Sequence, residues 1–326
     1  MSEEASIGNI NSVSSENVGN ILDVSGQSIG HVMGVELGGA DSFVTTCQEQ
    51  DTLYALWTCQ DVNTGDLATG AECMTDISGN GRPAIKAVVA STGNWQIEDT
   101  SAPSGNSSAL TKYVSADVDD QGSTNYAAVD SAITPIASEL GLSSGFVIYY
   151  MPSFWQRMEI ACYTGTDGSP VGSTGALLLN SYSDYLQAAN SAGGGNTDFN
   201  PQSGGSTDNS GNTSRTCNPD PGGSANCDDF DGNWVFWGWR LPRHGTDEFK
   251  SIHYVQKIGS AWGTNQSAWT KEPQGMFATM RAGLRFGYGS NGTRPAGTAW
   301  AAHAIFTGDI GADGLQAIYE AAGFAS

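Results

Sequence analysis

Apolar and aromatic residues occur in short runs along most of the chain, and clusters of Gly, Ser, Asn and Asp separate the runs. This pattern is typical of strands joined by turns. We predict strands at Ser42–Thr46, Thr52–Cys59, Ala84–Ala90, Asn94–Ile97, Gly145–Met151, Arg157–Tyr163, Asn233–Leu241 and Ser251–Ile258. The run from 233 to 241 is apolar at both odd and even positions, which favours a central strand buried on both faces. The pattern as a whole predicts an all-β sandwich of two antiparallel sheets.

The last fifty or so residues have a distinct ending. Two runs rich in Ala, Phe and Trp are separated by the turn cluster 290–295, so they read as consecutive strands. A helix should follow from Ala312 to Ala322, with Gly323 after its end. Its apolar positions fall on one helical face: Leu315, Ile318 and Tyr319.

Three other segments are not strand-like. Residues 99–125 are polar and read as a loop, and Tyr126–Leu142 has helical spacing interrupted by Pro135, so it predicts at best a short helix. Residues 192–233 form a long loop rich in Gly, Ser, Asn and Asp. We therefore expect helix mainly in parts of 126–142 and 312–322.

Residues 1–36 contain three copies of one unit at a period of eleven residues. Each copy has the order apolar, Gly, polar, apolar, followed three residues later by Val. The repeated apolar positions are Ile7, Ile10, Val13, Val18, Ile21, Val24, Ile29, Val32 and Val35. A single unit buries almost nothing, so these positions should meet neighbouring subunits or another protein. The alternative is a flexible acidic leader whose period is fortuitous. We predict an anchoring or oligomerisation segment at 1–36 and a sandwich at 37–326.

The net charge of the chain is −21, and no Lys or Arg precedes Arg82. Such a surface repels phosphate, so nucleic acid is not expected as a partner. The chain begins MSEEASIGNI, without the basic and apolar regions of a secretory signal, and no apolar run approaches the length that spans a bilayer. We expect neither secretion by that route nor membrane insertion.

No catalytic motif stands out. Glycoside hydrolases need two carboxylates flanking one sugar bond, but Glu159 is alone in its predicted strand. Glu98 and Asp99 are adjacent, so on a strand they would lie on opposite faces. The cysteines form no C-x-x-C pair, which disfavours a zinc site. We therefore expect a protein that is not an enzyme.

Three candidate binding features remain. Hard oxygen donors for calcium cluster at Asp220, Asp228, Asp229 and Asp231, although a solvated acidic loop is the alternative. Cys217 and Cys227 flank a turn-rich stretch and are candidates for a disulfide, although free thiols are expected in a cytosolic protein. Trp262 and Trp269 lie in polar surroundings and are candidates for glycan stacking, whereas Trp234, Trp237 and Trp239 fit core packing better.

Two stretches resemble known families. The ending, with Gly308, Asp309 and Ile310 followed by Gly314, Leu315, Ile318 and Tyr319, resembles LamG-like, concanavalin A-like jelly-roll sandwiches. The N-terminal units are similar to the I-x-x-I-N-G-V repeats of tailed-bacteriophage structural proteins, with Asn11-Ser12-Val13 and Gly34-Val35 as the best matches.

These resemblances imply a non-enzymatic structural or adhesion protein of a tailed-phage virion, assembled in the host cytoplasm, in a fibre, the tail or the capsid decoration. Other virion proteins would be its partners, a host-surface glycan would be a candidate ligand, and the resemblance to fibres suggests a homotrimer. Two alternatives use the same fold: a secreted carbohydrate-active enzyme or carbohydrate-binding module, and a cellular adhesin or surface-layer protein.

Overall fold

A computed structural model gives the fold of the chain. It describes residues 20–21, 24–25, 31–32, 35–36, 41–81, 83–86, 95–116, 127–129, 144–152, 158–163, 177–182, 185–190, 197–199, 230, 232–240, 243–244, 248–249, 251–263, 267–271, 284–286 and 297–325. The described residues are mostly β-strands, and every strand pairing within them is antiparallel. No helix among them is long and apolar enough to cross a bilayer.

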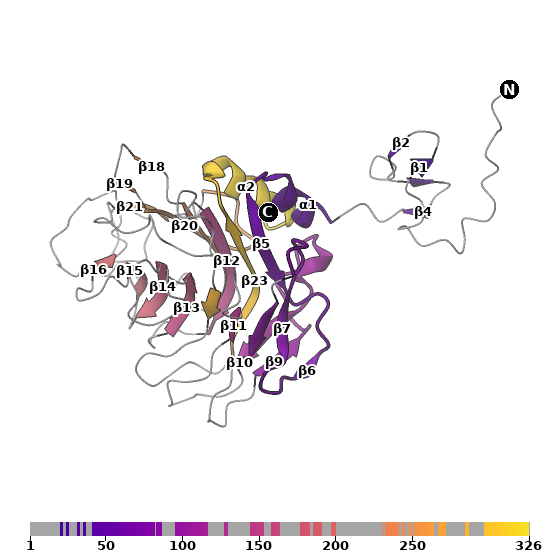
Figure 1. Cartoon of the computed structure of the whole chain (residues 1–326), viewed down its shortest axis with the longest axis horizontal. Helices are drawn as coiled ribbons and strands as arrows, with labels where there is room; N and C mark the ends of the chain where they lie inside the picture. Colours follow the sequence, from indigo (N-terminus) through magenta and orange to yellow (C-terminus); the bar gives the residue numbers. More distant parts are fainter. Residues whose placement is uncertain are drawn as a thin grey trace.

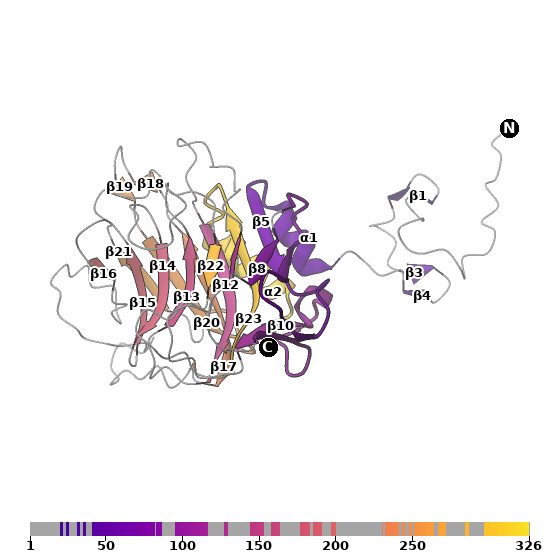
Figure 2. The same cartoon turned by 60° about the horizontal axis from the view of Figure 1, so that its bottom comes forward.

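Most strands belong to two large sheets (Figures 1 and 2). The first sheet has β23 at its centre, with β12, β17, β20 and β21 on one side and β5, β10, β9 and β6 on the other. Its strands are β5 (Leu53–Thr58), β6 (Gly65–Asp66), β9 (Trp95–Glu98), β10 (Tyr113–Ala116), β12 (Ser144–Met151), β17 (Asn233–Arg240), β20 (Ser251–Lys257), β21 (Ser267–Lys271) and β23 (Thr298–Phe306).

The second sheet runs in the order β16, β15, β14, β13, β22, β11, β8 and β7. Its strands are β7 (Glu72–Asp76), β8 (Ala84–Lys86), β11 (Ala127–Val129), β13 (Met158–Tyr163), β14 (Leu177–Tyr182), β15 (Tyr185–Asn190), β16 (Thr197–Phe199) and β22 (Leu284–Phe286). Strand β7 also pairs with β5, so the two sheets are joined at this edge. A separate small ribbon pairs β18 (Arg243–His244) with β19 (Glu248–Phe249).

The main core lies between the two sheets and is rich in tryptophan. Its largest members are almost fully buried and come from the first sheet: Trp57, Trp95, Trp237, Trp239 and Trp300. The second sheet contributes residues such as Ile160, Leu179 and Phe286. The indole of Trp95 stacks on that of Trp300 with ring centroids 5.6 Å apart. Burial of so much aromatic surface is the main stabilising term that the structure shows.

A second core covers the other face of the first sheet. Helix α1 (Ser42–Glu49), helix α2 (Gly311–Ala321) and a 3₁₀ turn (Ser108–Leu110) pack on it. Leu315 and Tyr319 of α2 meet the side of the sheet that carries Phe146 and Phe236. The first sheet is therefore buried on both faces, which explains why β17 is apolar at odd and even positions and why all nine residues of β23 are buried.

Several predicted strands are confirmed with small shifts of their ends: β5, β9, β12, β13, β17 and β20. The prediction of a strand at Ser42–Thr46 is wrong, because these residues begin helix α1. The carboxylate of Asp41 caps this helix by accepting the amides of Phe43 at 3.0 Å and Val44 at 3.2 Å. Phe43 and Cys47, one helical turn apart, are the buried positions of α1.

The predictions of a loop at 99–125 and of a short helix in Tyr126–Leu142 are also corrected. The stretch 99–125 is not all loop, because it contains the 3₁₀ turn and strand β10. In Tyr126–Leu142 the described residues 127–129 form strand β11 rather than helix, and the others lie outside the described residues. The loop 192–233 contains strand β16, and most of its other residues lie outside the described part.

The closing strand, turn and helix are placed as predicted. Gly308 lies so close to Thr52, just before β5, that an added Cβ would be 2.4 Å from its Cγ2, which explains why glycine occupies this position. Helix α2 buries Leu315, Ile318 and Tyr319, the three positions that the helical spacing indicated. The division of the chain at residue 36 stays a prediction.

Candidate functional sites

The second and third N-terminal repeats each contain a small β-hairpin. Strand β1 (Asn20–Ile21) pairs with β2 (Val24–Ser25), and β3 (His31–Val32) pairs with β4 (Val35–Glu36). The registers are identical, because Ile21 pairs with Val24 as Val32 pairs with Val35. In the two repeats that the structure describes, the period of eleven residues is thus a period of hairpins.

Only part of the predicted anchoring set can be located. Four of its positions have described backbone: Ile21, Val24, Val32 and Val35. The other five lie outside the described residues: Ile7, Ile10, Val13, Val18 and Ile29. Figures 1 and 2 both place the hairpins away from the two sheets and helices. Their burial against other subunits stays a prediction.

The sandwich begins at a tightly bonded joint around Asp41. Besides capping α1, its carboxylate accepts hydrogen bonds from the hydroxyls of Ser107, at 2.8 and 2.9 Å, and Ser108, at 2.9 Å. The amide of Ala109 also donates to it, at 3.2 Å. Burial alone would raise the pKa of Asp41, but these hydrogen bonds outweigh burial and the pKa is lowered.

The two ends of the sandwich meet at this joint. Helix α1 packs on α2, and the hydroxyl of Ser42 donates to the carbonyl of Ala321 at 2.7 Å. The amide of Asn106 donates to the carbonyl of Ala322 at 2.9 Å. The start of helix α1 is therefore hydrogen-bonded to the end of helix α2.

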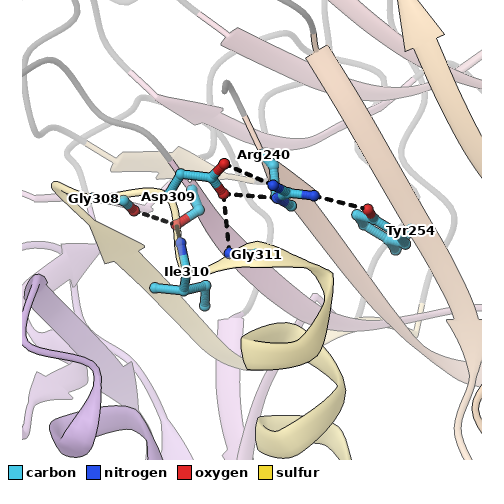
Figure 3. A network of polar contacts seen from close by, with 7 residues as sticks. Arg240, Tyr254, Gly308, Asp309, Ile310 and Gly311 are labelled. Carbon is cyan, nitrogen blue, oxygen red and sulfur yellow. Dashed lines mark hydrogen bonds and ion pairs between the residues drawn. The ribbon is translucent and has the colours of Figure 1, made fainter. Parts of the chain in front are cut away.

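A second polar cluster fastens the turn between β23 and α2 (Figure 3). The guanidinium of Arg240, at the end of β17, donates Nε and one Nη to the two carboxylate oxygens of Asp309, each at 2.7 Å. Its other Nη donates to the hydroxyl of Tyr254 at 3.2 Å. The hydrogen bond to Asp309 is the main reason that the pKa of Arg240 is raised. This bidentate geometry is the strong form of an Arg–Asp pair.

The same turn is bonded to the first sheet and to the helix. The carboxylate of Asp309 also accepts the amide of Gly311, at 3.0 Å, at the start of α2. The hydroxyl of Ser144 donates to the carbonyl of Gly308 at 2.7 Å. The Gly-Asp-Ile turn is therefore a structural fastening. Its partners Arg240 and Ser144 were missed from the sequence because no local pattern links residues so far apart.

Trp262, a predicted glycan-stacking residue, lies beside this cluster. It is half-buried, and its ring packs against three aromatic residues: Tyr319 at 5.4 Å, Tyr254 at 6.1 Å and Phe236 at 6.2 Å. The interplanar angle with Tyr254 is 27°, so these two rings stack. Trp262 thus covers the outer core while keeping part of its surface in solvent. Trp269 lies in β21, and its side chain is outside the described part.

The other predicted tryptophans have clear positions. Trp237 and Trp239 are fully buried in the main core, which confirms core packing for both. Trp234 is half-buried on the outer face, where its indole N–H donates to the carbonyl of Ser101 at 2.9 Å. Ser101 has a positive φ of 63°, the one such non-glycine residue among those described.

Glu98 is held by neutral neighbours. Its carboxylate accepts hydrogen bonds from Gln96 at 3.0 Å, from the hydroxyl of Tyr113 at 3.3 Å and from Ser115. These hydrogen bonds fix the position of the Glu98 carboxylate on β9. Glu159 lies in β13, with its side chain outside the described part.

The predicted calcium and disulfide positions cannot be located. Asp220, Asp228, Asp229 and Asp231 lie outside the described residues, as do Cys217 and Cys227. Both features stay predictions. Within the described part, no group of three metal-ligating side chains is close enough to hold an ion. Three cysteines of the described part are fully buried: Cys47, Cys59 and Cys73. Burial raises the pKa of Cys47 and Cys59, which makes them poor nucleophiles.

Two histidines are buried in the first sheet. His253 accepts the indole N–H of Trp237 at its Nδ1, 3.1 Å away. His303 is fully buried in β23 against the ring of Phe286, 4.7 Å away, and neither ring nitrogen has a hydrogen-bond partner among the described residues. Burial lowers the pKa of each to about 3, so both are neutral at physiological pH.

No family model matches the chain, and no curated protein matches it. Solved structures with a similar course of the chain include the receptor-binding domain of botulinum neurotoxin type G, with a TM-score of 0.45, 10% identity, and coverage of 82% of this chain and 51% of that one. Another is the ligand-binding domain of botulinum neurotoxin serotype D in complex with N-acetylneuraminic acid, with a TM-score of 0.42, 9% identity, and coverage of 86% and 52%.

A third is the binding domain of botulinum neurotoxin DC in complex with rat synaptotagmin II, with a TM-score of 0.44, 8% identity, and coverage of 84% and 52%. The chain therefore spans about half the length of these structures. Likeness at this level decides neither the activity nor the ligand of this chain.

Proposed function

We propose that this chain is a non-enzymatic structural component of a tailed-phage virion, held on the particle by residues 1–36 and presenting a LamG-like, concanavalin A-like sandwich. The observation that carries the proposal is the repeated hairpin, because two successive repeats adopt the same register. The similarity of these repeats to those of phage structural proteins supplies the phage assignment. Fibre, tail and capsid-decoration positions are all compatible with it.

The energetics support attachment through this segment. Nine repeated apolar positions, if fully buried, would contribute roughly 1.5–3 kcal/mol each, which is enough in sum to drive association. Left in water they would form an apolar surface of the kind that monomers avoid. On the sandwich side, the carboxylate of Asp41 bonds the start of helix α1 to Ser107 and Ala109.

Presentation of the sandwich suits recognition better than catalysis. The half-buried ring of Trp262 stacks on Tyr254, whose hydroxyl is bonded to Arg240, and Arg240 is paired with Asp309. An aromatic surface next to fixed polar groups is the chemistry that sugars use. We therefore extend the proposal to glycan binding at Trp262. The alternative on the same fold is a carbohydrate-active enzyme, which would need two carboxylates flanking one sugar bond.

Deletion of residues 2–36 tests the attachment. The truncated protein should fold, as reported by emission from its buried tryptophans, but should be lost from purified particles. A matched control keeps the length and composition of the segment but shuffles the order of residues 2–36, which destroys the period. Equal incorporation of truncated, shuffled and unaltered protein would show that the segment is only a leader.

A further inference from the structure

Two cysteines come together at the edge where the two sheets join. Strand β7 pairs with β5 of the first sheet and with β8 of the second. Thr58 lies opposite Thr75 in the pairing of β5 with β7, so Cys59 and Cys73 continue the two antiparallel strands toward the same end. Both side chains are fully buried and belong to the main core.

A bulge in β7 turns Cys73 toward this core. Glu72 pairs with Ile85 and Met74 pairs with Ala84, so Cys73 is an extra residue between two neighbouring pairs. Successive side chains of a regular strand face opposite sides, yet Cys73 and Met74 are both fully buried in the main core. The bulge thus places the thiol of Cys73 on the same side as that of Cys59.

The thiol of Cys59 reaches the backbone of Cys73. It donates to the carbonyl of Cys73 at 3.2 Å, and the thiol of Cys73 donates to the carbonyl of Ala84 at 3.3 Å. Burial is the main reason that the pKa of Cys59 is raised, and the proximity of Cys73 raises it further. Residues on adjacent antiparallel strands have Cα separations at which a disulfide can form. Rotation about the Cα–Cβ bonds would turn each sulfur from its carbonyl toward the other.

The segment that joins the two cysteines gives access to them. Leu67 is its one buried residue, and most of the others are exposed. The ammonium of Lys112 holds the start of the segment by donating to the carbonyls of Gln60 at 3.0 Å and Val62 at 2.7 Å. A segment with so little buried surface opens at a lower cost than the whole domain. Its opening exposes Cys59 to solvent beside a positive charge, which favours the reactive thiolate.

We propose that Cys59 and Cys73 form a redox modification site, at which a small-molecule disulfide such as glutathione disulfide converts the two thiols into a cross-link. The thiolate of Cys59 attacks one sulfur of glutathione disulfide, which breaks its S–S bond, forms a mixed disulfide and releases one glutathione. The thiolate of Cys73 then attacks the sulfur of Cys59 and releases the second glutathione. The two cysteines lose two electrons and two protons, and the glutathione disulfide gains both.

The cross-link would fasten the sandwich where its sheets meet. It links the end of β5, in the first sheet, to β7, which also pairs with β8 of the second sheet. The two cysteines are 14 positions apart, and closing a loop of this size restricts the unfolded chain. The cross-link depends neither on attachment to a particle nor on glycan binding.

The first experiment maps the cross-link in the full-length protein by mass spectrometry. The protein is kept at pH 8 with glutathione disulfide or with dithiothreitol, and the remaining thiols are alkylated in denaturant. A protease that cleaves before Asp places Cys47, Cys59 and Cys73 on the separate peptides 41–50, 51–60 and 66–75. After oxidation we expect the last two peptides to be joined, with two hydrogen atoms fewer than their sum. Cys47, buried in the other core, should stay alkylated in both samples.

The second experiment measures the midpoint of thermal unfolding with and without oxidation. We expect oxidation to raise the midpoint of the unaltered protein by roughly 5–10 °C. Cys59→Ala should remove this rise, and Cys73→Ala tests the same bond from its other end. Cys47→Ala is the matched control, because it also replaces a fully buried cysteine but should keep the rise. Each variant is compared with itself in the two redox states, so its own loss of stability cancels.

Three outcomes would overturn the inference. Peptides 51–60 and 66–75 that stay separate after oxidation would show that the cross-link does not form. Glutathione that stays on Cys59 without transfer to Cys73 would show that the second sulfur does not reach the first. An equal rise of the midpoint in Cys59→Ala and in the unaltered protein would assign the stabilisation to other cysteines.

Discussion

The imidazole of His303, which is buried and has no hydrogen-bond partner among the described residues, makes the stability of the sandwich depend on pH in a predictable direction. Its pKa is about 3 in the folded protein, against an ordinary value of 6.5. In the unfolded chain His303 therefore binds a proton as the pH falls below 6.5. In the folded protein it binds that proton only near pH 3. Stability should be lost progressively as the pH drops through this window.

The magnitude follows from the width of the window. One pKa unit corresponds to about 1.36 kcal/mol, so at pH 5 the contribution of His303 is a loss of about 2 kcal/mol relative to neutral pH. His253, with the same lowered pKa of about 3, should add a similar loss. The unaltered protein should thus lose about 4 kcal/mol between pH 7 and pH 5 from these two side chains.

The substitution His303→Phe isolates one of them. Chemical denaturation at pH 7 and pH 5, followed by tryptophan emission, gives the free energy of unfolding for both proteins. We expect the variant to lose about 2 kcal/mol less than the unaltered protein between the two pH values. Any overpacking of the larger ring against Phe286 shifts both measurements equally and cancels from this difference.

His253→Phe is the matched control. It should remove a similar part of the pH dependence, but it should also destabilise the protein at both pH values by about 1–3 kcal/mol, because the indole of Trp237 loses an acceptor. If His303→Phe and the unaltered protein lost the same free energy between pH 7 and pH 5, the reasoning would be refuted, since His303 would then be protonated in the folded state as readily as in the unfolded one.

Two further predictions concern the joint and the glycan surface. Asp41→Ala should destabilise the sandwich by roughly 2–4 kcal/mol in thermal or chemical unfolding, because it removes a helix cap and the acceptor of Ser107, whereas the exposed Asp51→Ala should change little. Because the pKa of Asp41 is lowered in the folded state, its contribution should be present above the unfolded value near 4 and vanish as the pH falls through the folded value; a flat response would contradict this. Trp262→Ala should abolish binding on a glycan array while Trp262→Phe retains part of it, and unchanged binding by the alanine variant would remove Trp262 from the site.

The strands that could be predicted from the sequence are those in which burial decides every position. The stretch from Val235 to Trp239 is buried at every position, because a strand between two cores covers both of its faces. Helix α1 could not be predicted in the same way. Val44, Thr45 and Thr46 favour strand by intrinsic preference, but the cap at Asp41 and the burial of Phe43 outweigh it.

The candidate sites were less predictable because they depend on distant residues. Arg240 and Asp309 are 69 residues apart, and neither belongs to a local motif that names the other. Trp262 has polar neighbours in sequence, which predicts exposure, yet Tyr319 from the last helix packs against its ring. For the hairpins, the period of eleven residues could be recognised in the sequence. The pairing of Ile21 with Val24 inside one repeat could be recognised only in the structure.

The meeting of Ser42 with Ala321 has a consequence for how this sandwich can be moved between proteins. When the first and last helices of a domain lie side by side, the two residues of a carrier protein that flank the inserted domain can stay close together. Such a domain can be inserted into a surface loop of an unrelated carrier, or cut out of one, without separating the two ends of that loop. The sandwich can thus be transferred between proteins as one unit, and the contact between helices α1 and α2 holds its first and last helices together.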